Sequence, residues 1–398
     1  MQDSLYLHFD GLNHPLQLTG CEHLTQYFSI LFPEWAYRSG EQDDHPVISI
    51  RFEQDTYHFS SSQEQEVKLY TDKVDVLCAL IAALAVANSL TDLEALHLHA
   101  ASVVINGRLV VFPSQYRAGK SFLTACLVAD GQLYSGDDVL PLVLDNCKGR
   151  SAGFAPRLRL PLPTTTDEKS KIFIESHMDI QGKRYAYLNL DKESRIARNE
   201  LFDIGAFVLL ERRDGIDAKV EKLPASAIFQ QLIKQNYARE VNGSLILSTL
   251  SKAISQSQCI KLCYDRADDA VDLLKEYFSS WPSQSSDGEN KSYTLEQQNS
   301  KSELMTKDSL IQNEGVQKIK IDGESFLTSA DGQSIYHLDM IGSGIWELLS
   351  EPTTKDDVIS ILSTAFPDIA KQAIEKDTLK VLSSLRRNKL INIKTAHE

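Results

Sequence analysis

The sequence predicts an α/β core that follows a small α+β region and precedes a separate segment of short strands and helices. Three observations support this fold class. Residues 96–138 alternate between apolar runs typical of buried strands and one apolar helix, in the order strand, loop, helix, strand. Residues 282–303 are poor in apolar groups and interrupt the pattern. The length of 398 residues also exceeds that of one typical domain, about 100–200 residues.

Composition and charge restrict the classes of function. The chain has 41 Lys and Arg against 55 Asp and Glu, a net charge of −14, so no basic surface is expected for a nucleic acid or an anionic membrane. The N-terminus lacks the basic and apolar stretches of a secretory signal. The sequence therefore predicts a cytoplasmic protein with no nucleic-acid partner and no membrane partner. A homo-oligomer stays an open alternative.

The cysteines do not form a recognisable metal or disulfide pattern. The chain has six, and the closest pair, Cys259 and Cys263, lacks both the CxxC spacing and the neighbouring histidines of a zinc site. Reduced thiols in apolar surroundings are therefore expected.

Residues 1–95 are expected to form the small α+β region. Residues 47–52 and 57–59 read as a hairpin, and residues 72–90 as a helix that is apolar nearly all round. The longest uncharged apolar run, residues 76–87, is too short to span about 30 Å of hydrocarbon. The helix is thus expected to be a core helix packed on both sides.

Residues 96–281 are expected to form the α/β core. Residues 96–105 and 109–112 read as strands joined by a turn at Asn106-Gly107, a strong hairpin signal. A helix over 121–129 and a strand that ends at Asp137-Asp138 follow. Further along the chain, the sequence predicts a strand over 206–212 and helices over 224–236 and 267–280.

Residues 282–303 are rich in Ser, Gln, Asn and charge, which is typical of a flexible linker. Residues 304–398 form a second compact segment. It is expected to contain three short strands, over 316–321, 325–330 and 334–338, and then three helices, over 341–349, 355–366 and 373–390.

The segment with the most specific chemistry is residues 112–121, which follow a strand and open a helix. Backbone N–H groups in such a loop converge on phosphate oxygens, as in a P-loop. Lys120 would neutralise the β- and γ-phosphates of ATP, and the Ser121 hydroxyl would bind Mg²⁺. Ser114 occupies the position of the first P-loop glycine. The expected nucleotide-binding residues are Ser114, Arg117, Ala118, Gly119, Lys120, Ser121 and Phe122. An ordinary strand-to-helix loop with a surface lysine is the alternative.

Other polar residues of the core extend this site. Asp137 and Asp138 close a strand, where one carboxylate can hold Mg²⁺ and the other accept a proton; a pair that caps a turn is the alternative. His99 could polarise a phosphoryl oxygen, although His97 shares its predicted strand face. Arg157 and Arg159 could bind phosphate or an acidic acceptor, or could be solvated arginines of a strand.

The core resembles the HPr kinase/phosphorylase family, and more closely its smaller relatives, the HPr-kinase-like serine kinases found beside peptide-modification genes. The resemblance is carried by residues 98–107, by Ala118-Gly119-Lys120-Ser121 and by residues 135–139, and covers about half the chain. It implies an HPr-kinase-like P-loop fold, ATP and Mg²⁺ bound at Lys120 and Ser121, a catalytic base and a metal ligand in Asp137 and Asp138, and His99 at the active site. We take Asp138 as the metal ligand together with Ser121. The glycine-rich signature of true HPr kinases is missing, so HPr itself is not expected as the substrate.

Residues 304–398 resemble a PqqD-type domain, a winged-helix module that recruits precursor peptides. The resemblance is carried by residues 332–339, 342–349, 354–358 and 385–391. The segment has 11 basic against 14 acidic residues, so it has no basic face for DNA. An exposed third strand can instead accept an extended peptide as an added strand. The expected peptide-binding residues are Ser334, Ile335, Tyr336, His337, Leu338 and Leu382.

Together these patterns predict an ATP-dependent kinase that phosphorylates a serine-type hydroxyl on a peptide or protein recruited by the C-terminal domain. Two alternatives remain. One is a nucleotide-sensing, peptide-binding scaffold without transferase activity. The other is a small-molecule or sugar kinase, because P-loop chemistry does not specify the acceptor.

Overall fold

The structure is a computed structural model and describes residues 4–43, 45–113, 118–237, 241–281, 293–297 and 308–393. Ser114 and Arg117, and most of the predicted linker, lie outside these residues. The chain divides into two compact units, one of residues 1–223, 231–240 and 256–289 and the other of residues 224–230, 241–255 and 290–398. The predicted boundaries at 281 and 304 differ from this division, because residues 224–230 and 241–255 group with the C-terminal unit.

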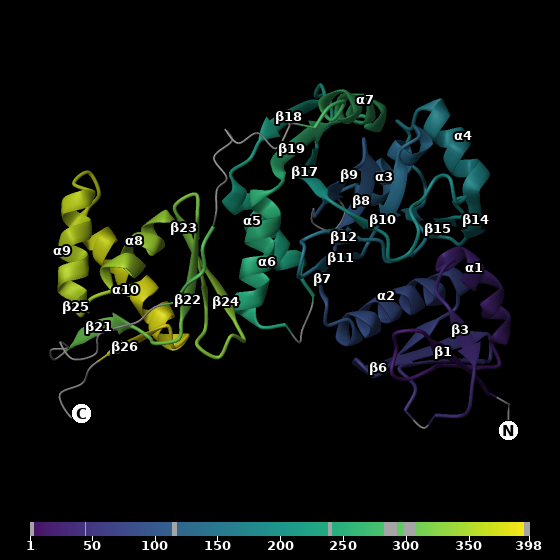
Figure 1. Cartoon of the computed structure of the whole chain (residues 1–398), viewed down its shortest axis with the longest axis horizontal. Coiled ribbons are helices and arrows are strands. Elements are labelled where there is room, and N and C mark those ends of the chain that lie inside the picture. Colours follow the sequence, from purple (N-terminus) through teal and green to yellow (C-terminus); the bar gives the residue numbers. More distant parts are fainter. Residues whose placement is uncertain are drawn as a thin grey trace. The chain divides into compact units, whose positions relative to one another are not determined.

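The N-terminal region of the first unit is a six-stranded sheet covered by one long helix (Figure 1). The strand order is β3-β1-β2-β4-β5-β6, with bounds β1 Ser4–Phe9, β2 Leu16–Thr19, β3 Tyr37–Ser39, β4 Ile48–Glu53, β5 Thr56–Ser61 and β6 Glu64–Tyr70. The helices are a 3₁₀ turn at Glu22–Tyr27, α1 Phe28–Leu31 and α2 Lys73–Thr91. The Asp72 side chain caps α2 by accepting a hydrogen bond from the Val74 N–H.

Helix α2 matches the predicted core helix. Its mean hydropathy of 2.0 over 18 residues makes it, among the described residues, the one helix long and apolar enough to cross a membrane, and half of that window is buried in the fold. Its buried face packs with the strands around Ile48, Ile50 and Phe59. The apolar composition of α2 thus serves the core of this region, as expected for a helix packed between layers.

The central sheet of the first unit has six strands in the order β10-β8-β9-β17-β19-β18. Their bounds are β8 Ala101–Ile105, β9 Arg108–Phe112, β10 Leu133–Gly136, β17 Ile204–Arg212, β18 Lys219–Lys222 and β19 Gln258–Tyr264. Strands β9, β17 and β19 run parallel, and the helices α3 Lys120–Ala129 and α7 Ala267–Tyr277 contribute to the apolar cluster of this sheet. The predicted hairpin is present between β8 and β9, where Asn106 and Gly107 both have positive φ, at 47° and 77°.

The predicted strand over residues 96–105 is in fact two strands in two sheets. Strand β7 Ala95–Leu98 joins a four-stranded sheet of order β16-β12-β11-β7, whose other members are β11 Leu140–Val143, β12 Gly149–Arg150 and β16 Leu201–Phe202. His99 and Ala100 connect β7 to β8. The period-two argument that placed His97 and His99 on one face therefore does not apply.

The remaining elements of this unit lie between β12 and β16 in the chain. A three-stranded sheet of order β13-β15-β14 comprises β13 Arg157–Arg159, β14 Met178–Gln181 and β15 Tyr185–Leu188. Helix α4 Glu168–His177 connects β13 to β14. No helix or strand bounds were predicted from the sequence for this part of the chain.

The C-terminal unit contains a four-stranded sheet of order β20-β22-β23-β24, with bounds β20 Glu296–Gln297, β22 Gln317–Ile321, β23 Glu324–Thr328 and β24 Ile335–Leu338. The three predicted helices are α8 Met340–Leu348, α9 Lys355–Ala365 and α10 Lys371–Arg387. A second small sheet, of order β25-β21-β26, was not predicted and comprises β21 Ser309–Gln312, β25 Thr353–Thr354 and β26 Ile391–Ile393. The core of this segment surrounds the fully buried Trp346.

Two helices from the middle of the chain contribute to the same unit: α6 Gly243–Ser255 and the first residues of α5 Ala225–Gln235. Phe229 contacts Phe326 edge-on with ring centroids 4.6 Å apart, and the Gly243 N–H donates to the Gly332 carbonyl at 2.8 Å. Phe326 on β23 thus packs against α5, and Leu327, the next residue, belongs to the core formed by α8–α10.

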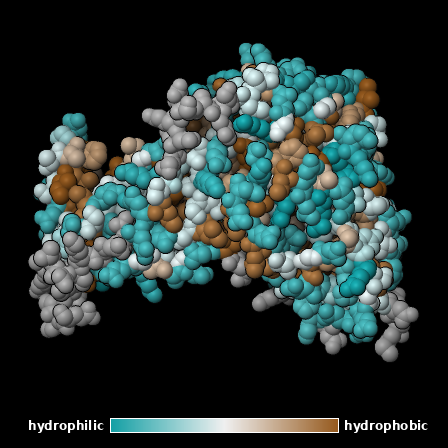
Figure 2. Space-filling view, viewed as in Figure 1, coloured by the Kyte–Doolittle hydropathy of each residue, from teal (hydrophilic) through white to brown (hydrophobic). Residues whose placement is uncertain are grey.

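Apolar side chains also reach the surface of the C-terminal unit. Figure 2 shows apolar residues gathered near α9, where Ile361 is 46% and Ile369 49% exposed. The site described next lies wholly in the first unit.

Candidate active site

The start of α3 contributes Lys120, a positively charged residue of the predicted phosphate-binding loop, to the site. Gly119 precedes the helix with φ +89° and ψ 10°, a left-handed conformation that favours glycine. A Cβ atom at this position would lie 3.0 Å from the Tyr264 hydroxyl, so the loop also passes close to β19. Lys120 and Ser121 follow in the first turn of the helix, at the carboxyl end of β9. This is the placement that a phosphate-binding loop requires.

Lys120 is buried, with 6% of its surface exposed. Burial lowers the pKa of its ammonium group, and the nearby charges of Asp138 and Asp137 oppose this effect. A buried lysine beside two carboxylates is a strong point charge for an anionic ligand, because little solvent screens it. The predicted grouping of Lys120 with the aspartates is therefore present in the structure.

Asp137 and Asp138 follow β10 and occupy different environments. Asp137 is 4% exposed; its Oδ2 atom accepts a hydrogen bond from the Arg157 N–H at 3.2 Å, and it is hydrogen-bonded to Ser121. Its Oδ1 atom has no hydrogen-bond partner among the described residues. Burial, together with the charge of Asp138, raises the pKa of Asp137 to about 7.

Asp138 has both carboxylate oxygens engaged. Oδ1 lies 3.3 Å from Nε2 of His99, and Oδ2 accepts a hydrogen bond from Nη2 of Arg157 at 2.5 Å. Burial favours the protonated form, but the His99 hydrogen bond and the Arg157 charge outweigh it and lower the pKa of this carboxyl group. Asp138 is thus held as a carboxylate between an imidazole and a guanidinium group.

His99 lies in the connection between β7 and β8, and its side chain is 36% exposed. His97 lies on β7, is fully buried and contacts Asp92 at 3.0 Å. The two histidines therefore have separate surroundings. Of the two, His99 is the one at the aspartate pair.

The predicted substrate arginines differ in their contacts. Arg157 pairs with Asp138 and also lies over the Tyr185 ring, 5.1 Å from its centroid. The charge of Asp138 raises the pKa of Arg157 against the effect of burial. Arg159, two residues along β13, is exposed and lies 5.7 Å from the same ring. Arg157 thus positions Asp138, and Arg159 is the more accessible cation.

These side chains surround a cavity of about 430 Å³, here called the phosphate cavity. Gly119, Lys120 and Ser121 line one part of it, and His99 and Asp138 another. The predicted residues Ala118, Phe122, Arg157 and Arg159 also line it. Its size lies within the range of small-ligand sites, about 300–1,000 Å³.

Sequence reasoning missed Arg212 and Tyr264, which line the phosphate cavity as well. Arg212 ends β17 and donates to the Asp265 carbonyl at 3.0 Å. Strand β17 pairs in parallel with β9 up to Phe207 and continues beyond it, so that Arg212 lies beside Tyr264 of β19. The signal was available, since the strand over 206–212 was predicted and its last residue is a cation.

The oxygen atoms of the site suit an Mg²⁺ ion whose remaining ligands come from a bound nucleotide. No group of three or more His, Cys, Asp or Glu side chains suited to a metal is found in the part of the chain that the structure describes. Mg²⁺ commonly takes one or two protein oxygens, with phosphates and water completing its six ligands. Ser121 and the open oxygen of Asp137 meet this need. The geometry favours Asp137 over the predicted Asp138, whose oxygens are both engaged.

A second cavity, of about 420 Å³, shares His99, Asp138 and Arg157 with the phosphate cavity. We call it the α2 cavity, because residues of α2 line it. Asp137 lines this cavity and not the first. The two cavities thus meet at Asp138 and its two partners.

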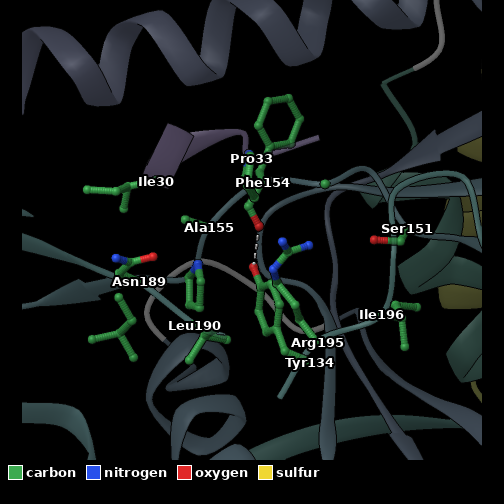
Figure 3. A pocket seen from close by; sticks show the side chains of 13 residues that line it. Ile30, Pro33, Tyr134, Ser151, Phe154, Ala155, Asn189, Leu190, Arg195 and Ile196 are labelled. Carbon is green, nitrogen blue, oxygen red and sulfur yellow. Dashed lines mark hydrogen bonds between the residues drawn. The ribbon is translucent and has the colours of Figure 1, made fainter. Parts of the chain in front are cut away.

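A third cavity, of about 20 Å³, has room for about one water molecule and none for a substrate (Figure 3). It lies against Phe154 and Ala155, which also line the α2 cavity. The Tyr134 hydroxyl donates to the Phe154 carbonyl at 3.0 Å and fixes this segment (Figure 3).

The predicted peptide-binding residues lie at the edge strand of the C-terminal sheet. Within the described residues, β24 pairs with β23 alone. Ser334 and His337 are exposed, and Ile335, Tyr336 and Leu338 are half-buried. His337 contacts Glu324 at 2.8 Å and stacks on Phe326. Leu382 belongs to the core, with 6% of its surface exposed, so α10 presents Leu379 rather than Leu382 to solvent.

Comparison with known proteins supports the resemblance of the C-terminal segment. Residues 324–391 match the family model of Coenzyme PQQ synthesis protein D (PqqD), so the C-terminal segment contains a PqqD domain. A structure described as TbiB1 in complex with the TbiA(beta) leader peptide is 23% identical, covers 21% of this chain and 94% of its own, and has a TM-score of 0.20. No curated protein sequence matches the chain.

A second solved structure is similar to a larger part of the chain. The Hpr(Ser) kinase/phosphatase from Coxiella burnetii is 13% identical, covers 46% of this chain and 93% of its own, and has a TM-score of 0.23. At this identity and TM-score, the likeness supports no conclusion about the fold or activity of this chain.

Proposed function

We propose that this chain is an ATP-dependent kinase that phosphorylates a serine-type hydroxyl of a peptide recruited by its PqqD domain. The observation that carries the proposal is the convergence of Lys120, Ser121 and Asp138 on one cavity, with Asp137 hydrogen-bonded to Ser121 at its edge. An ordinary strand-to-helix loop has no reason to bury a lysine beside two carboxylates, since each buried charge costs free energy unless it is paired.

The residues of the phosphate cavity have separate roles in this proposal. The N–H groups at the start of α3 and the Lys120 ammonium group bind the phosphates of ATP, and Arg159 and Arg212 add positive charge. Ser121 and Asp137 would hold Mg²⁺, which neutralises charge on the transferring phosphoryl group.

Asp138 is the proposed base. The acceptor oxygen bonds to the γ-phosphorus, the bond between that phosphorus and the ADP oxygen breaks, and the hydroxyl proton passes to Asp138. His99 and Arg157 fix the orientation of this carboxylate. Because Asp138 lines both cavities, it can face the acceptor and the phosphate at once.

The PqqD domain supports a peptide as the acceptor. An extended peptide added to the edge of β24 would be held by backbone hydrogen bonds. Binding in the same chain raises the effective concentration of the acceptor, to the millimolar range for a short flexible connection. A weakly bound acceptor side chain could then still react.

The test uses the full chain, Mg·ATP and a precursor peptide that contains serine, with mass spectrometry of the peptide. We expect the peptide to gain the mass of one phosphoryl group. Lys120→Ala should lower kcat by about 10²–10³-fold, as expected when one preorganised donor to the transferring group is lost. Lys169→Ala is the control, because Lys169 is exposed on α4 and lies outside the lining of the phosphate cavity.

Two results would contradict the proposal. One is ATP binding without transfer to any peptide, which would favour the scaffold. The other is efficient transfer to a free sugar with none to peptides, which would favour a small-molecule kinase.

A further inference from the structure

The α2 cavity reaches the same reactive residues as the phosphate cavity, but its lining is more apolar. Lys120 and Ser121 line only the phosphate cavity, whereas Asp138 lines both. The remaining wall of the α2 cavity is largely apolar and includes Ile81, Ala85 and Val86 of α2. A group bound in the α2 cavity would contact Asp138 without contacting Lys120.

Helix α2 has two apolar faces. One packs in the core of the N-terminal region, and the other lines the α2 cavity. Leu77, Leu80 and Leu84 are fully buried in the core of the N-terminal region. Ile81, Ala82, Ala85 and Val86 lie on average about 140° further round the helix and line the cavity, and Ile81 and Ala85 also contact the core of the N-terminal region. Two of these four are alanines, so the helix leaves open space on this side. A helix that only stabilised the sheet would be expected to carry polar residues here.

The other wall of the α2 cavity comes from the end of α5, residues 234–237. This segment is fixed to the strand that precedes His99: the His99 N–H donates to the Gln235 carbonyl at 2.8 Å, and the Tyr237 N–H donates to the His97 carbonyl at 3.0 Å. The Tyr237 hydroxyl is buried and has no hydrogen-bond partner among the described residues. A buried unpaired hydroxyl costs free energy, which a bound ligand that pairs with it can recover.

We propose that the α2 cavity is the acceptor site and that it selects a serine or threonine adjacent to an apolar residue. This inference rests on the proposed function and adds the class of acceptor. The hydroxyl meets Asp138, the apolar neighbour packs against Ala82, Ala85 and Val86, and the Tyr237 hydroxyl bonds to the peptide backbone. The N-terminal region thereby forms part of the substrate site.

The same wall disfavours a sugar acceptor. A sugar carries hydroxyl groups on several sides, and an apolar helix face would leave some of them without hydrogen bonds. A peptide has one hydroxyl to present and an apolar side chain to bury. The chemistry of the α2 cavity therefore favours a peptide over a polyol.

The first experiment maps the binding site on the wild-type full chain. A serine peptide that carries photo-leucine next to the serine is crosslinked in the presence of Mg·ADP, and the adducts are located by mass spectrometry. Adducts in residues 73–91 or 234–237 are expected. Adducts found only elsewhere would overturn the inference, even if the chain transfers phosphate to peptides.

The second experiment compares two acceptor peptides that differ only beside the serine, one with leucine and one with glutamine. We expect kcat/KM to be about tenfold higher for the leucine peptide, a normal contribution of an apolar pocket. Ala82→Trp should remove this preference by filling the cavity, chiefly through KM, with ATP affinity unchanged. Leu93→Trp is the matched control, because Leu93 is 64% exposed and does not line the cavity.

The outcomes separate this inference from the proposed function. Equal kcat/KM for both peptides, or an unchanged preference in Ala82→Trp, would overturn the acceptor site and leave the kinase intact. Crosslinks to α2 without phosphate transfer would support the acceptor site and contradict the kinase.

Discussion

The two adjacent carboxylates show how position changes the chemistry of one residue type. Asp137 keeps an oxygen open and is bonded to Ser121, while Asp138 is held by His99 and Arg157. The turn after β10 permits this, because adjacent residues of a continuous strand would point to opposite faces. The pair therefore supports two roles at one site.

The two aspartates should give different kinetic defects. Asp138→Asn removes the proposed base, so kcat should fall by about 10²–10⁴-fold while the affinity for Mg·ATP changes little. Asp137→Asn removes the proposed metal ligand, so activity should require a higher Mg²⁺ concentration. Rates measured across a Mg²⁺ titration distinguish these results. Recovery of Asp138→Asn at high Mg²⁺ would show that the roles are reversed.

A second, half-buried ion cluster, away from the site, makes stability depend on pH. Burial of Asp92 favours protonation, but the hydrogen bond with His97 and the charge of Arg150 outweigh it and lower the pKa of Asp92. The stabilisation is thus present above the unfolded pKa of about 3.9 and is lost as the pH falls through the lower folded value.

Asp92→Asn tests this cluster. At pH 7 it should reduce the free energy of unfolding by about 1–3 kcal/mol, since removal of one partner leaves the half-buried Arg150 without its counter-charge. The difference from wild type should shrink near pH 3, where Asp92 is becoming protonated in the wild type too. Urea unfolding at both pH values measures it; a difference independent of pH would contradict the assignment.

At the scale of elements, local motifs were predictable and long-range assembly was not. The strand-to-helix loop with Lys120 and the turn at Asn106-Gly107 depend on adjacent residues. Strands β8 and β9 and helix α3, which these two features connect, are found where the sequence predicts them. The break between β7 and β8 was missed because both halves are apolar and fully buried. Tyr237 reaches the site only through packing between distant segments, for which one sequence has no local signal, whereas Arg212 ends a predicted strand and could have been proposed.

Strand β24 should be the docking edge for the precursor peptide. Within the described residues β24 pairs with β23 alone and ends its sheet, so an added strand can pair along its outer edge. Amide hydrogen exchange in residues 334–338 should therefore slow when the peptide is added, and a scrambled peptide should have no effect. Slowing confined to β26 would place the docking edge on the other small sheet.

At the scale of the whole molecule, the C-terminal segment is more than a tethered module. Residues 224–230 and 241–255 belong to its compact unit. Phe229 is fully buried against Phe326, and the Ser226 N–H donates to Asp322 at 3.0 Å. These contacts connect two parts of the sequence that are about a hundred residues apart.

Truncation of the chain after residue 289 should therefore destabilise the helices left behind. Exposure of Phe229 alone costs about 1.5–3 kcal/mol, so amide exchange in residues 224–230 and 243–255 should become faster than in the full chain. Exchange in α3, which packs within the other unit, serves as the internal control. Unchanged exchange in both helices would show that the C-terminal segment is dispensable for their folding.

The position of Asp138 between two cavities also affects how much ATP is hydrolysed without an acceptor. When no peptide is bound, water can enter the place of the acceptor hydroxyl and meet the same carboxylate and the same γ-phosphorus. The chain should then hydrolyse ATP slowly to ADP and inorganic phosphate. Because the α2 face offers water few hydrogen bonds, this futile turnover should be slow, and it should cease as the precursor saturates the enzyme.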